Sequence, residues 1–574
     1  MNALVLLVIG LAVLIVGYLT YGRWLAKTWG VDPSRETPAH ELEDGNDYCP
    51  AKAPVLLGHH FSSIAGAGPI NGPIQAAVFG WVPVFLWVLI GGVFFGAVHD
   101  FGALFASIRH KGQSIGEVIG ENIGPRAKKL FTIFGYLVLV LVVAAFASIV
   151  ASTFDGFDAN GAEVIANGRT ASISLLFIVL AIIFGFCVYR KNAPLGISTI
   201  IGVVGIVIIT VIGMNFPIYV ESNIWMIILG IYILVASVTP VWILLQPRDY
   251  LSSFLLYFMM AVAFIGIIAA HPTLEIPAFT GMEDQITTLG SLFPALFITI
   301  ACGAISGFHS LVGSGTTAKQ LNSEKDALPI GYGAMLIECA LAIISLIAVG
   351  YGWSAYVDGS IRTPTAVFAN GISSMIATIP GLAGSKDTLY SLLVLAVSVF
   401  CLTSLDTATR LARYMFQELW LAPGETVKDA KGWKAVLTNP YVATIITVVI
   451  GIGLGMTGYS LIWPLFGAAN QLLAALALLA VCCWLGNIGK NNKMFYIPMV
   501  FMLIMTLWSL INTMIAKFGA IASGNADVIT AAGGSAACYI QGIFGAILFV
   551  LAIFLVIEGF GALSKNGKKA SAAK

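Results

Sequence analysis

Apolar residues follow one another along most of this chain in runs about as long as a lipid bilayer is thick. A helix that crosses the hydrocarbon core needs roughly 20 such residues. About fifteen runs meet or approach that length, so the pattern predicts an all-α, polytopic membrane protein. We expect membrane helices near residues 2–22, 55–80, 81–108, 130–152, 170–189, 196–214, 223–245, 249–270, 289–317, 327–350, 386–409, 440–457, 461–486, 494–516 and 540–562.

The composition agrees with this class. Of 574 residues, 58% are hydrophobic and only 10% are charged, which is too little charge for the surface of a soluble protein of this length. The net charge of +1 provides no basic face, so we expect no nucleic-acid partner. The chain has no GxSxG, HExxH or GxxxxGK[ST] motif, which argues against an enzyme and against ATP-driven transport.

Basic residues gather in alternate loops, and in short loops they mark the cytoplasmic side of a membrane. Lys and Arg are frequent in 109–129 and 410–434, whereas 153–169 holds only Arg169 and 271–288 holds neither. This alternation predicts an N-terminus outside the cell, with the segment 23–54 and the C-terminus in the cytoplasm. Two prolines interrupt residues 361–380, for which we expect a partly helical excursion outside the membrane.

The segment 61–73 reads FSSIAGAGPINGP inside one of the membrane-length runs. Its glycines and prolines disfavour a continuous helix there. In a bilayer, irregular backbone is tolerated where it lines a cavity, and in secondary transporters it often forms the substrate site. Unpaired main-chain amides at a half-helix N-terminus would face an anionic carboxylate. We therefore predict substrate binding by Ala65, Gly66, Ala67, Gly68, Pro69 and Asn71.

A second interruption is predicted at Pro240, inside the run 223–245, which is the sixth helix when 55–80 is counted first. The predicted topology gives these two helices opposite directions, as an inverted five-plus-five repeat requires. The repeats would be 55–214 and 223–420, preceded by 1–54 and followed by membrane helices at 440–563 and a cytoplasmic tail at 564–574. Ser237, Thr239 and Pro240 would then face the same cavity. The alternative is that Pro240 only kinks a helix.

Residues 307–321 read GFHSLVGSGTTAKQL, and the first of them resemble 61–68 in the spacing of Phe, Ser and Gly. Sodium is a hard cation that prefers hydroxyl and carbonyl oxygens. A coupling site could therefore use Ser310, Ser314, Thr316 and Thr317, or these small residues could serve close helix packing. His309 lies beside them and titrates near neutral pH, so the coupling ion could instead be a proton.

Other polar residues at membrane depth have simpler explanations. Asp406 and Arg410 are four residues apart, so we expect an ion pair on one helix face that neutralises both, with a gating latch as the alternative. Cys49, His59 and His60 could hold a transition metal, but no diagnostic spacing joins them. Orientation of the helix entry, or a gate, explains them better, and we expect no resident metal or other cofactor.

Several motifs resemble the carbon starvation protein A (CstA) family, and they occur in order across most of the chain. They are GHHFSSIAGAGPINGP (58–73), AVHDFGALFASIRHKGQSIGE (97–117), PVWILLQPRDYL (240–251), FITIACGAISGFHSLVGSGTTAKQL (297–321), GYGAML (331–336), SLDTATRLARYMFQEL (404–419) and WPLFGAANQLLAALAL (463–478). The resemblance implies a multi-pass carrier of the inner (plasma) membrane with a LeuT-like core, related to the amino acid–polyamine–organocation superfamily. It also implies transport of peptides or of pyruvate during carbon starvation.

Together these features predict an ion-coupled secondary importer of short peptides or a small carboxylate, driven by protons or sodium and working by alternating access. A nutrient sensor or structural membrane protein that keeps a transporter fold without flux is the alternative of another class.

Overall fold

The computed structural model describes residues 1–45, 47–158, 161–191, 193–287, 289–361, 363–421, 425, 427 and 429–572. Within these ranges, regular structure is helical, and β-type pairing is limited to isolated bridges. Eleven helices are long and apolar enough to cross a membrane. The prediction of an all-α, polytopic membrane protein is therefore confirmed.

Most helices follow the predicted membrane segments, and their bounds follow the apolar runs. The long ones are α1 (Ala3–Gly17) with α2 (Arg23–Trp29), α6 (Trp81–Gly91) with α7 (Ala97–Arg109), α9 (Pro125–Phe154), α10 (Ile165–Gly185), α11 (Leu195–Asn215), α13 (Leu245–Ala270), α16 (Ala334–Tyr351), α19 (Lys386–Glu418), α22 (Tyr459–Asn487), α23 (Tyr496–Ala522) and α25 (Ser535–Ala572). Two shorter apolar helices are α12 (Ser222–Val238) and α21 (Pro440–Gly455). The loop 361–380 contains α18 (Pro364–Ala377), so it is partly helical as predicted.

Two membrane segments are broken in the middle. The first consists of α4 (Ala53–Ile64) and α5 (Gly68–Ala76), so the break predicted within 61–73 is confirmed, and it lies at residues 65–67. The second consists of α14 (Leu292–Thr299) and α15 (Gly307–Gly315), separated by residues 300–306. The prediction of one continuous helix over 289–317 is wrong, because residues 300–306 leave the helix where a neighbouring helix supplies substitute hydrogen bonds.

The segment around Pro240 differs from the expectation. Helix α12 ends at Val238, and residues 239–244 form a turn that leads into α13. Pro240 therefore lies between two membrane helices rather than within one. Its missing amide and fixed backbone suit the end of a helix as well as a kink, which is why the sequence alone did not distinguish the two.

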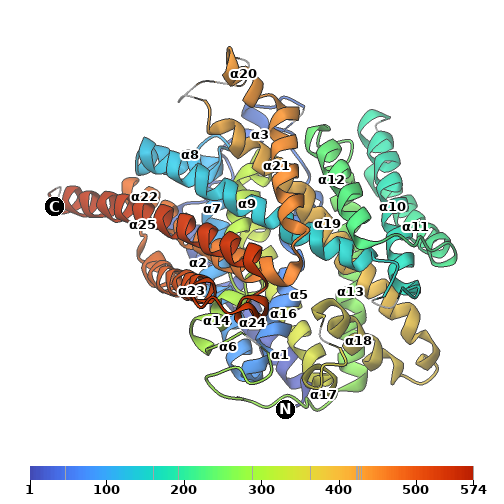
Figure 1. The fold of residues 1–574 in the computed structure, drawn as a ribbon. Helices are drawn as coiled ribbons and strands as arrows, with labels where there is room; N and C mark the ends of the chain where they lie inside the picture. Colours follow the sequence, from blue (N-terminus) through green and yellow to red (C-terminus); the bar gives the residue numbers. More distant parts are fainter. Residues whose placement is uncertain are drawn as a thin grey trace.

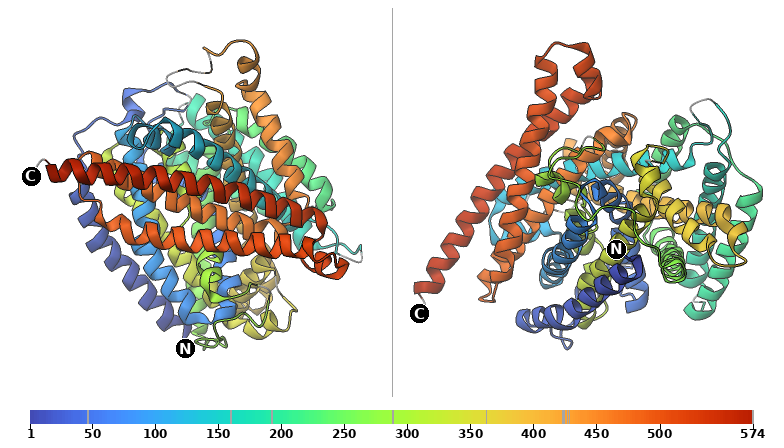
Figure 2. Two further views of the ribbon diagram at one scale, coloured as in Figure 1. Left: turned by 60° about the vertical axis from the view of Figure 1, so that its left-hand side comes forward. Right: turned by 90° about the horizontal axis from the view of Figure 1, so that it is seen from below.

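A pair of long helices forms the centre of the molecule. Helices α9 and α19 pack along each other, and the short α12 and α21 pack against both (Figure 1). The broken segments lie beside this centre, with α4 against α13, α5 against α16 and α15 against α7. The hairpin of α10 and α11 lies at one edge, and α23 and α25 lie at the opposite edge (Figure 2). Ile200 and Ile201 of α11 expose 67% and 66% of their surface, as residues facing lipid should.

Candidate functional site

The two breaks face each other at close range. A Cβ at Gly68 would lie 2.4 Å from the Cβ of Cys302, and one at Gly72 would lie 2.7 Å from the carbonyl oxygen of Thr299. A Cβ at Gly303 would in turn lie 2.9 Å from that of Ala342. These distances are below van der Waals contact. Only glycine at 68 and 72 therefore allows α5 to approach the second broken segment so closely, and only glycine at 303 allows that segment to approach α16.

Polar main-chain groups remain at the first break, and the surrounding residues 65–71 are buried. The amides of Ala65 and Gly66 bond back to Phe61 and Ile64. Among the described residues, the Gly68 amide donates to no acceptor, and that of Ala67 only approaches the Cys401 sulfur.

The rest of α5 narrows the predicted substrate-binding set. The amides of Ile70 and Asn71 bond to the Ala67 carbonyl, and Pro69 has no amide hydrogen. The side-chain nitrogen of Asn71 donates to the hydroxyl of Tyr459 at 3.3 Å, but its Oδ1 has no partner within the described part of the chain. Among the described residues, the Gly68 amide and Asn71 Oδ1 therefore have no hydrogen-bond partner, and the Ala67 amide has only the Cys401 sulfur.

The second break is held by α22. Asn470 accepts from the amide of Phe308 at 2.8 Å and donates to Ser306 Oγ at 3.0 Å. Gln471 Nε2 donates to three carbonyls at the end of α14 and in the break, those of Phe297, Ile300 and Ala301, at 3.2–3.3 Å. Side chains from another helix therefore replace the helical hydrogen bonds that this break lacks.

A cluster of two histidines and two acids lies next to the breaks; we call it the histidine–carboxylate cluster. Asp100 of α7 accepts from His99 Nδ1 and from His309 Nδ1, both at 2.7 Å. The other ring nitrogen of His309 lies 3.5 Å from Glu338 of α16, whose two oxygens have no hydrogen-bond partner among the described residues. The His309 ring also lies close to the backbone of Ile64, where α4 ends.

The charge of this cluster depends on protons. All four side chains are at most 2% exposed, and no Lys or Arg among the described residues pairs with them. An unpaired charge at membrane depth is strongly unfavourable. A buried set of carboxylates and imidazoles without a fixed cation is favoured only where it also holds protons, which gives the cluster the chemistry of a proton-binding site.

Three of the buried residues could also approach one metal ion. Ligand atoms of Cys302, His309 and Glu338 lie within 4.8 Å of one another, and such a set suits Zn²⁺. Binding would require both Cys302 and Glu338 to lose a proton in a fully buried place. The thiol of Cys302 instead lies 3.4 Å from Ser306 Oγ as a donor. A proton site explains the same geometry with fewer requirements.

The metal candidates from the sequence are not brought together. His59 Nδ1 lies 2.9 Å from Asp249, and His60 Nδ1 lies 2.8 Å from Thr317 Oγ1. Cys49 lies in the loop before α4, where burial and then the acidic neighbours raise the pKa of its thiol to about 11. Each of the three has its own surroundings, and they do not form a common ligand set.

A second buried network, the arginine–aspartate network, joins four helices. Arg248 donates to Asp249 Oδ1 at 2.6 and 3.1 Å, to the hydroxyl of Tyr232 at 2.8 Å and to Asp406. Tyr232 in turn donates to Asp406 at 2.6 Å, and His59 pairs with Asp249. Both aspartates and Arg248 are fully buried.

The predicted ion pair between Asp406 and Arg410 is wrong. Asp406 pairs with Arg248, while Arg410 donates to the carbonyls of Ala236, at 3.0 Å, and Thr239. The last carbonyls of a helix lack partners within it, and α12 ends at these residues. Arg410 therefore satisfies the end of α12, because α13 places a stronger partner on Asp406.

The hydroxyls proposed for sodium have partners of their own. Ser310, Ser314 and Thr316 donate to carbonyls three or four residues earlier, at 2.6–2.9 Å. Thr317 bonds to His60. These contacts support the packing alternative for the hydroxyls; the sodium cage stays a prediction.

Ser237, Thr239 and Pro240 lie elsewhere. Ser237 Oγ lies 3.3 Å from Thr444 of α21, and the Thr239 hydroxyl donates to Val235 at 2.7 Å. Pro240 is exposed. Within the described part of the chain, no hydrogen bond links these three residues to the first break, so the structure does not bring the two predicted substrate segments together.

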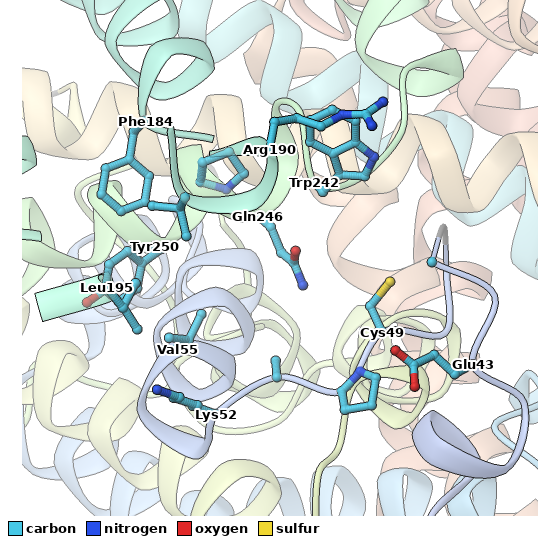
Figure 3. A pocket seen from close by; sticks show the side chains of 15 residues that line it. Glu43, Cys49, Lys52, Val55, Phe184, Arg190, Leu195, Trp242, Gln246 and Tyr250 are labelled. Carbon is cyan, nitrogen blue, oxygen red and sulfur yellow. The ribbon is translucent and has the colours of Figure 1, made fainter. Parts of the chain in front are cut away.

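A cavity of about 650 Å³ opens beside the start of α13, and we call it the vestibule. Its lining includes Lys52 and Glu43 from the loop before α4, with Arg190 stacked on Trp242 opposite them (Figure 3). Gln246 also lines it and donates to Gln320 at 2.7 Å; Gln320 lies 3.4 Å from His59. A layer of two glutamines thus separates the vestibule from the arginine–aspartate network.

The vestibule wall is tied to the second broken segment. The amide of Cys49 donates to the Lys319 carbonyl at 3.2 Å, and that of Ala51 donates to Gln320 at 3.0 Å. These bonds join the loop before α4 to the residues that follow α15.

Arg248 and Asp249 were not expected as members of a site. In the sequence, Arg248 reads as one of the basic residues that mark a cytoplasmic loop, but its side chain is 0% exposed. The available signal was the pair Arg-Asp directly before an apolar run, where adjacent opposite charges can enter the membrane as an ion pair.

The chain is similar in sequence to known transporters and similar in fold to a solved transporter structure. A Bacillus subtilis protein named peptide transporter CstA is 33% identical over 83% of this chain and 84% of its own length. An Escherichia coli protein named pyruvate/proton symporter BtsT is 32% identical over 89% of this chain and 81% of its own. The solved structure of a manganese transporter mutant from Eremococcus coleocola shares the fold, with a TM-score of 0.53 at 13% identity over 91% of this chain and 99% of that one.

The family model described as carbon starvation protein CstA matches residues 2–358 and 353–509. Most of the chain is covered by that match, and the relatives agree with it. The chain therefore belongs to the carbon starvation protein CstA family.

Proposed function

We propose that this protein is a proton-coupled secondary transporter that imports short peptides or a small carboxylate such as pyruvate by alternating access. The names of its relatives support this: several are called peptide transporters and one a pyruvate/proton symporter. The proposal includes a place in the inner (plasma) membrane with the N-terminus outside and the C-terminus in the cytoplasm, as the basic loops predict.

The proposal includes a LeuT-like core of two inverted repeats, at 53–270 and 292–487 rather than at 55–214 and 223–420. Each repeat then begins with a broken segment, α4–α5 or α14–α15, and has a short fourth helix, α12 or α21. The contacts between α9 and α19, and of both with the short helices, support this pairing. The α10–α11 hairpin becomes an insertion in the first repeat.

The observation that carries the proposal is the pair of facing breaks with unpaired main-chain groups at membrane depth. The Gly68 amide begins α5 and the Ala67 amide directly precedes it, at the end of the helix where the dipole favours negative charge. A carboxylate of pyruvate or of a peptide C-terminus is the group they would accept. Helices that break at the binding site are how secondary transporters form such sites.

The histidine–carboxylate cluster supplies the proposed coupling. Its members come from α7, α15 and α16, and His309 lies beside the end of α4. Loss or gain of a proton at His309 or Glu338 changes the attraction between helices of the two proposed repeats. Sodium coupling through Ser310, Ser314, Thr316 and Thr317 is the alternative from the sequence.

Transport into proteoliposomes tests the proposal. Purified protein should accumulate labelled pyruvate or dialanine when the inside is alkaline, and a sodium gradient alone should not drive uptake. Counterflow of a labelled substrate without a gradient would demonstrate a carrier. If the protein binds a substrate but shows neither accumulation nor counterflow, it is a sensor that keeps a transporter fold.

A further inference from the structure

Arg248 has no free donor in this structure. Its guanidinium contacts Asp249, Tyr232 and Asp406, and one nitrogen also lies 3.5 Å from the carbonyl of Thr403. Asp406, by contrast, is incompletely satisfied: its Oδ1 is buried and has no hydrogen-bond partner among the described residues. An added anion could reach Arg248 only by taking the place of one of these acceptors.

The network holds one guanidinium and two carboxylates. The Nε2 of Gln320 is a donor and lies 3.4 Å from His59 Nε2, which fits an imidazole that accepts there and donates through Nδ1 to Asp249. With His59 neutral, Arg248 faces two carboxylates. A second excess charge in this buried place would be strongly unfavourable, so an anion can enter only together with a proton.

Arg248 lies within reach of both the vestibule and the first break. Its neighbours Gln246 and Pro247 line the vestibule. On the other side, Ser63 of α4 lies 3.4 Å from Asp249, and its carbonyl accepts from Ser404. The network therefore lies between an open cavity and the last turn before the break at 65–67.

We propose that Arg248 receives the substrate carboxylate on its way from the vestibule, before the amides at 67–68 accept it, and that Asp406 occupies its place when no substrate is bound. This inference rests on the proposed transport function and names the chemistry of the cargo. A proton adds to the Asp406 carboxylate, Arg248 transfers its hydrogen bonds from Asp406 to the incoming carboxylate, and the net charge of the network is unchanged. A guanidinium suits this exchange because it is permanently charged and its planar donors form charge-assisted hydrogen bonds to carboxylates.

Among the described residues, the titratable groups that contact Arg248 or its partners come from four helices. They are His59 from α4, Tyr232 from α12, Asp249 from α13 and Asp406 from α19. Arg410 lies on α19 as well but donates to the end of α12. Among these groups Asp406 is the one that contacts Arg248, has an unpaired oxygen and has no histidine partner, so the proton is assigned to it.

Binding measurements on the purified full-length protein in detergent test the assignment. For the wild type, we expect pyruvate and dialanine to be bound with uptake of about one proton per carboxylate, seen with a pH indicator in weak buffer. The apparent Kd should rise about tenfold per pH unit above the protonation range, as linkage of one proton requires. Dialanine amide, which lacks the carboxylate, should not bind.

Substitutions at Arg248 and Asp406 provide a second test of the assignment. Arg248→Lys keeps the charge but loses the planar donors, and it should weaken binding of both ligands at least about tenfold. Asp406→Asn mimics the protonated acid, so its affinity should no longer change with pH, and the proton uptake that accompanies binding should vanish. The proton of the histidine–carboxylate cluster belongs to the later transport step, so Asp406→Asn leaves that cluster unchanged. Arg126→Lys on the exposed start of α9 is the matched control and should behave as the wild type.

Each outcome separates this inference from the function it rests on. Wild-type binding without proton uptake, binding of dialanine amide as tight as dialanine, or unchanged affinity of Arg248→Lys would overturn the role of Arg248 while leaving a transporter. Binding of only one ligand identifies the cargo as a monocarboxylate or a peptide, and supports the assignment if it shows the proton. Failure of the wild type to bind either ligand contradicts the proposed function itself. If Arg248→Lys does not fold, the wild-type proton count still decides.

Discussion

The two broken segments of this protein solve the same problem in different ways. At 300–306, the side chains of Asn470 and Gln471 take up the hydrogen bonds that the helix has lost. At 65–67, no comparable side chain of the described residues covers the amide of Gly68, and Asn71 keeps an unpaired oxygen. The break at 300–306 is thus stabilised by side chains of α22, whereas the break at 65–67 keeps polar groups that a ligand could use.

The largest effect is expected where the two breaks touch. Gly68→Leu would place a side chain 2.4 Å from Cys302 and force α5 away from residues 300–306, so we expect uptake to fall more than about a hundredfold, in line with the sensitivity of reacting and binding geometry to small displacements. Uptake into proteoliposomes measures it.

A matched control is available for that substitution. A Cβ at Gly384 would meet no heavy atom of the described residues within 4 Å, so Gly384→Leu should transport normally. Normal uptake by Gly68→Leu, with the protein folded and inserted, would end the case for close main-chain approach at the first break.

The second-largest effect is expected on the coupling of transport to the proton gradient. His309→Gln keeps a polar side chain but removes the titrating group between Asp100 and Glu338, so accumulation driven by a proton gradient should fall at least about tenfold, in the range typical of lost proton transfer. Counterflow should persist, because it needs no gradient. Gradient-driven accumulation equal to the wild type would remove the histidine–carboxylate cluster from the mechanism.

The break at 300–306 should contribute to the thermal stability of the protein. Asn470→Ala leaves the amide of Phe308 and the hydroxyl of Ser306 without their partner, and a buried unsatisfied group costs about 1–3 kcal/mol. Thermal unfolding in detergent should show a lower midpoint. The corresponding change at the first break, Asn71→Ala, removes only a long bond to Tyr459 and should lower the midpoint less while weakening substrate binding more.

The smallest effect tests which segment faces the first break. Ser237 contacts Thr444 at 3.3 Å, and α12 packs mainly against α9, α19 and α21. Ser237→Ala should therefore change uptake less than about twofold, as expected for loss of one weak hydrogen bond. A large loss of substrate affinity would restore the sequence prediction that residues 237–240 share the cavity.

The sequence disclosed the first break because glycine and proline are local signals that need no partner to be recognised. The second break was hidden, since residues 300–306 read IACGAIS without a proline and are opened by side chains about 170 positions away on α22. Fold class and the helix spans were predictable from apolar length. The pairing of Asp406 with Arg248 was not, because spacing along one helix favoured Arg410 and only tertiary packing supplies the competitor.

One small pairing has a mechanical consequence. Residues 49–51 are hydrogen-bonded to residues 319–320. The loop that lines the vestibule is therefore linked to the half-helix that carries His309. If that half-helix tilts when the protonation of His309 changes, the loop must move with it or its hydrogen bonds to residues 319–320 must break. The vestibule loop and His309 would then move together, and a spectroscopic label on the loop would report the protonation state of this buried histidine.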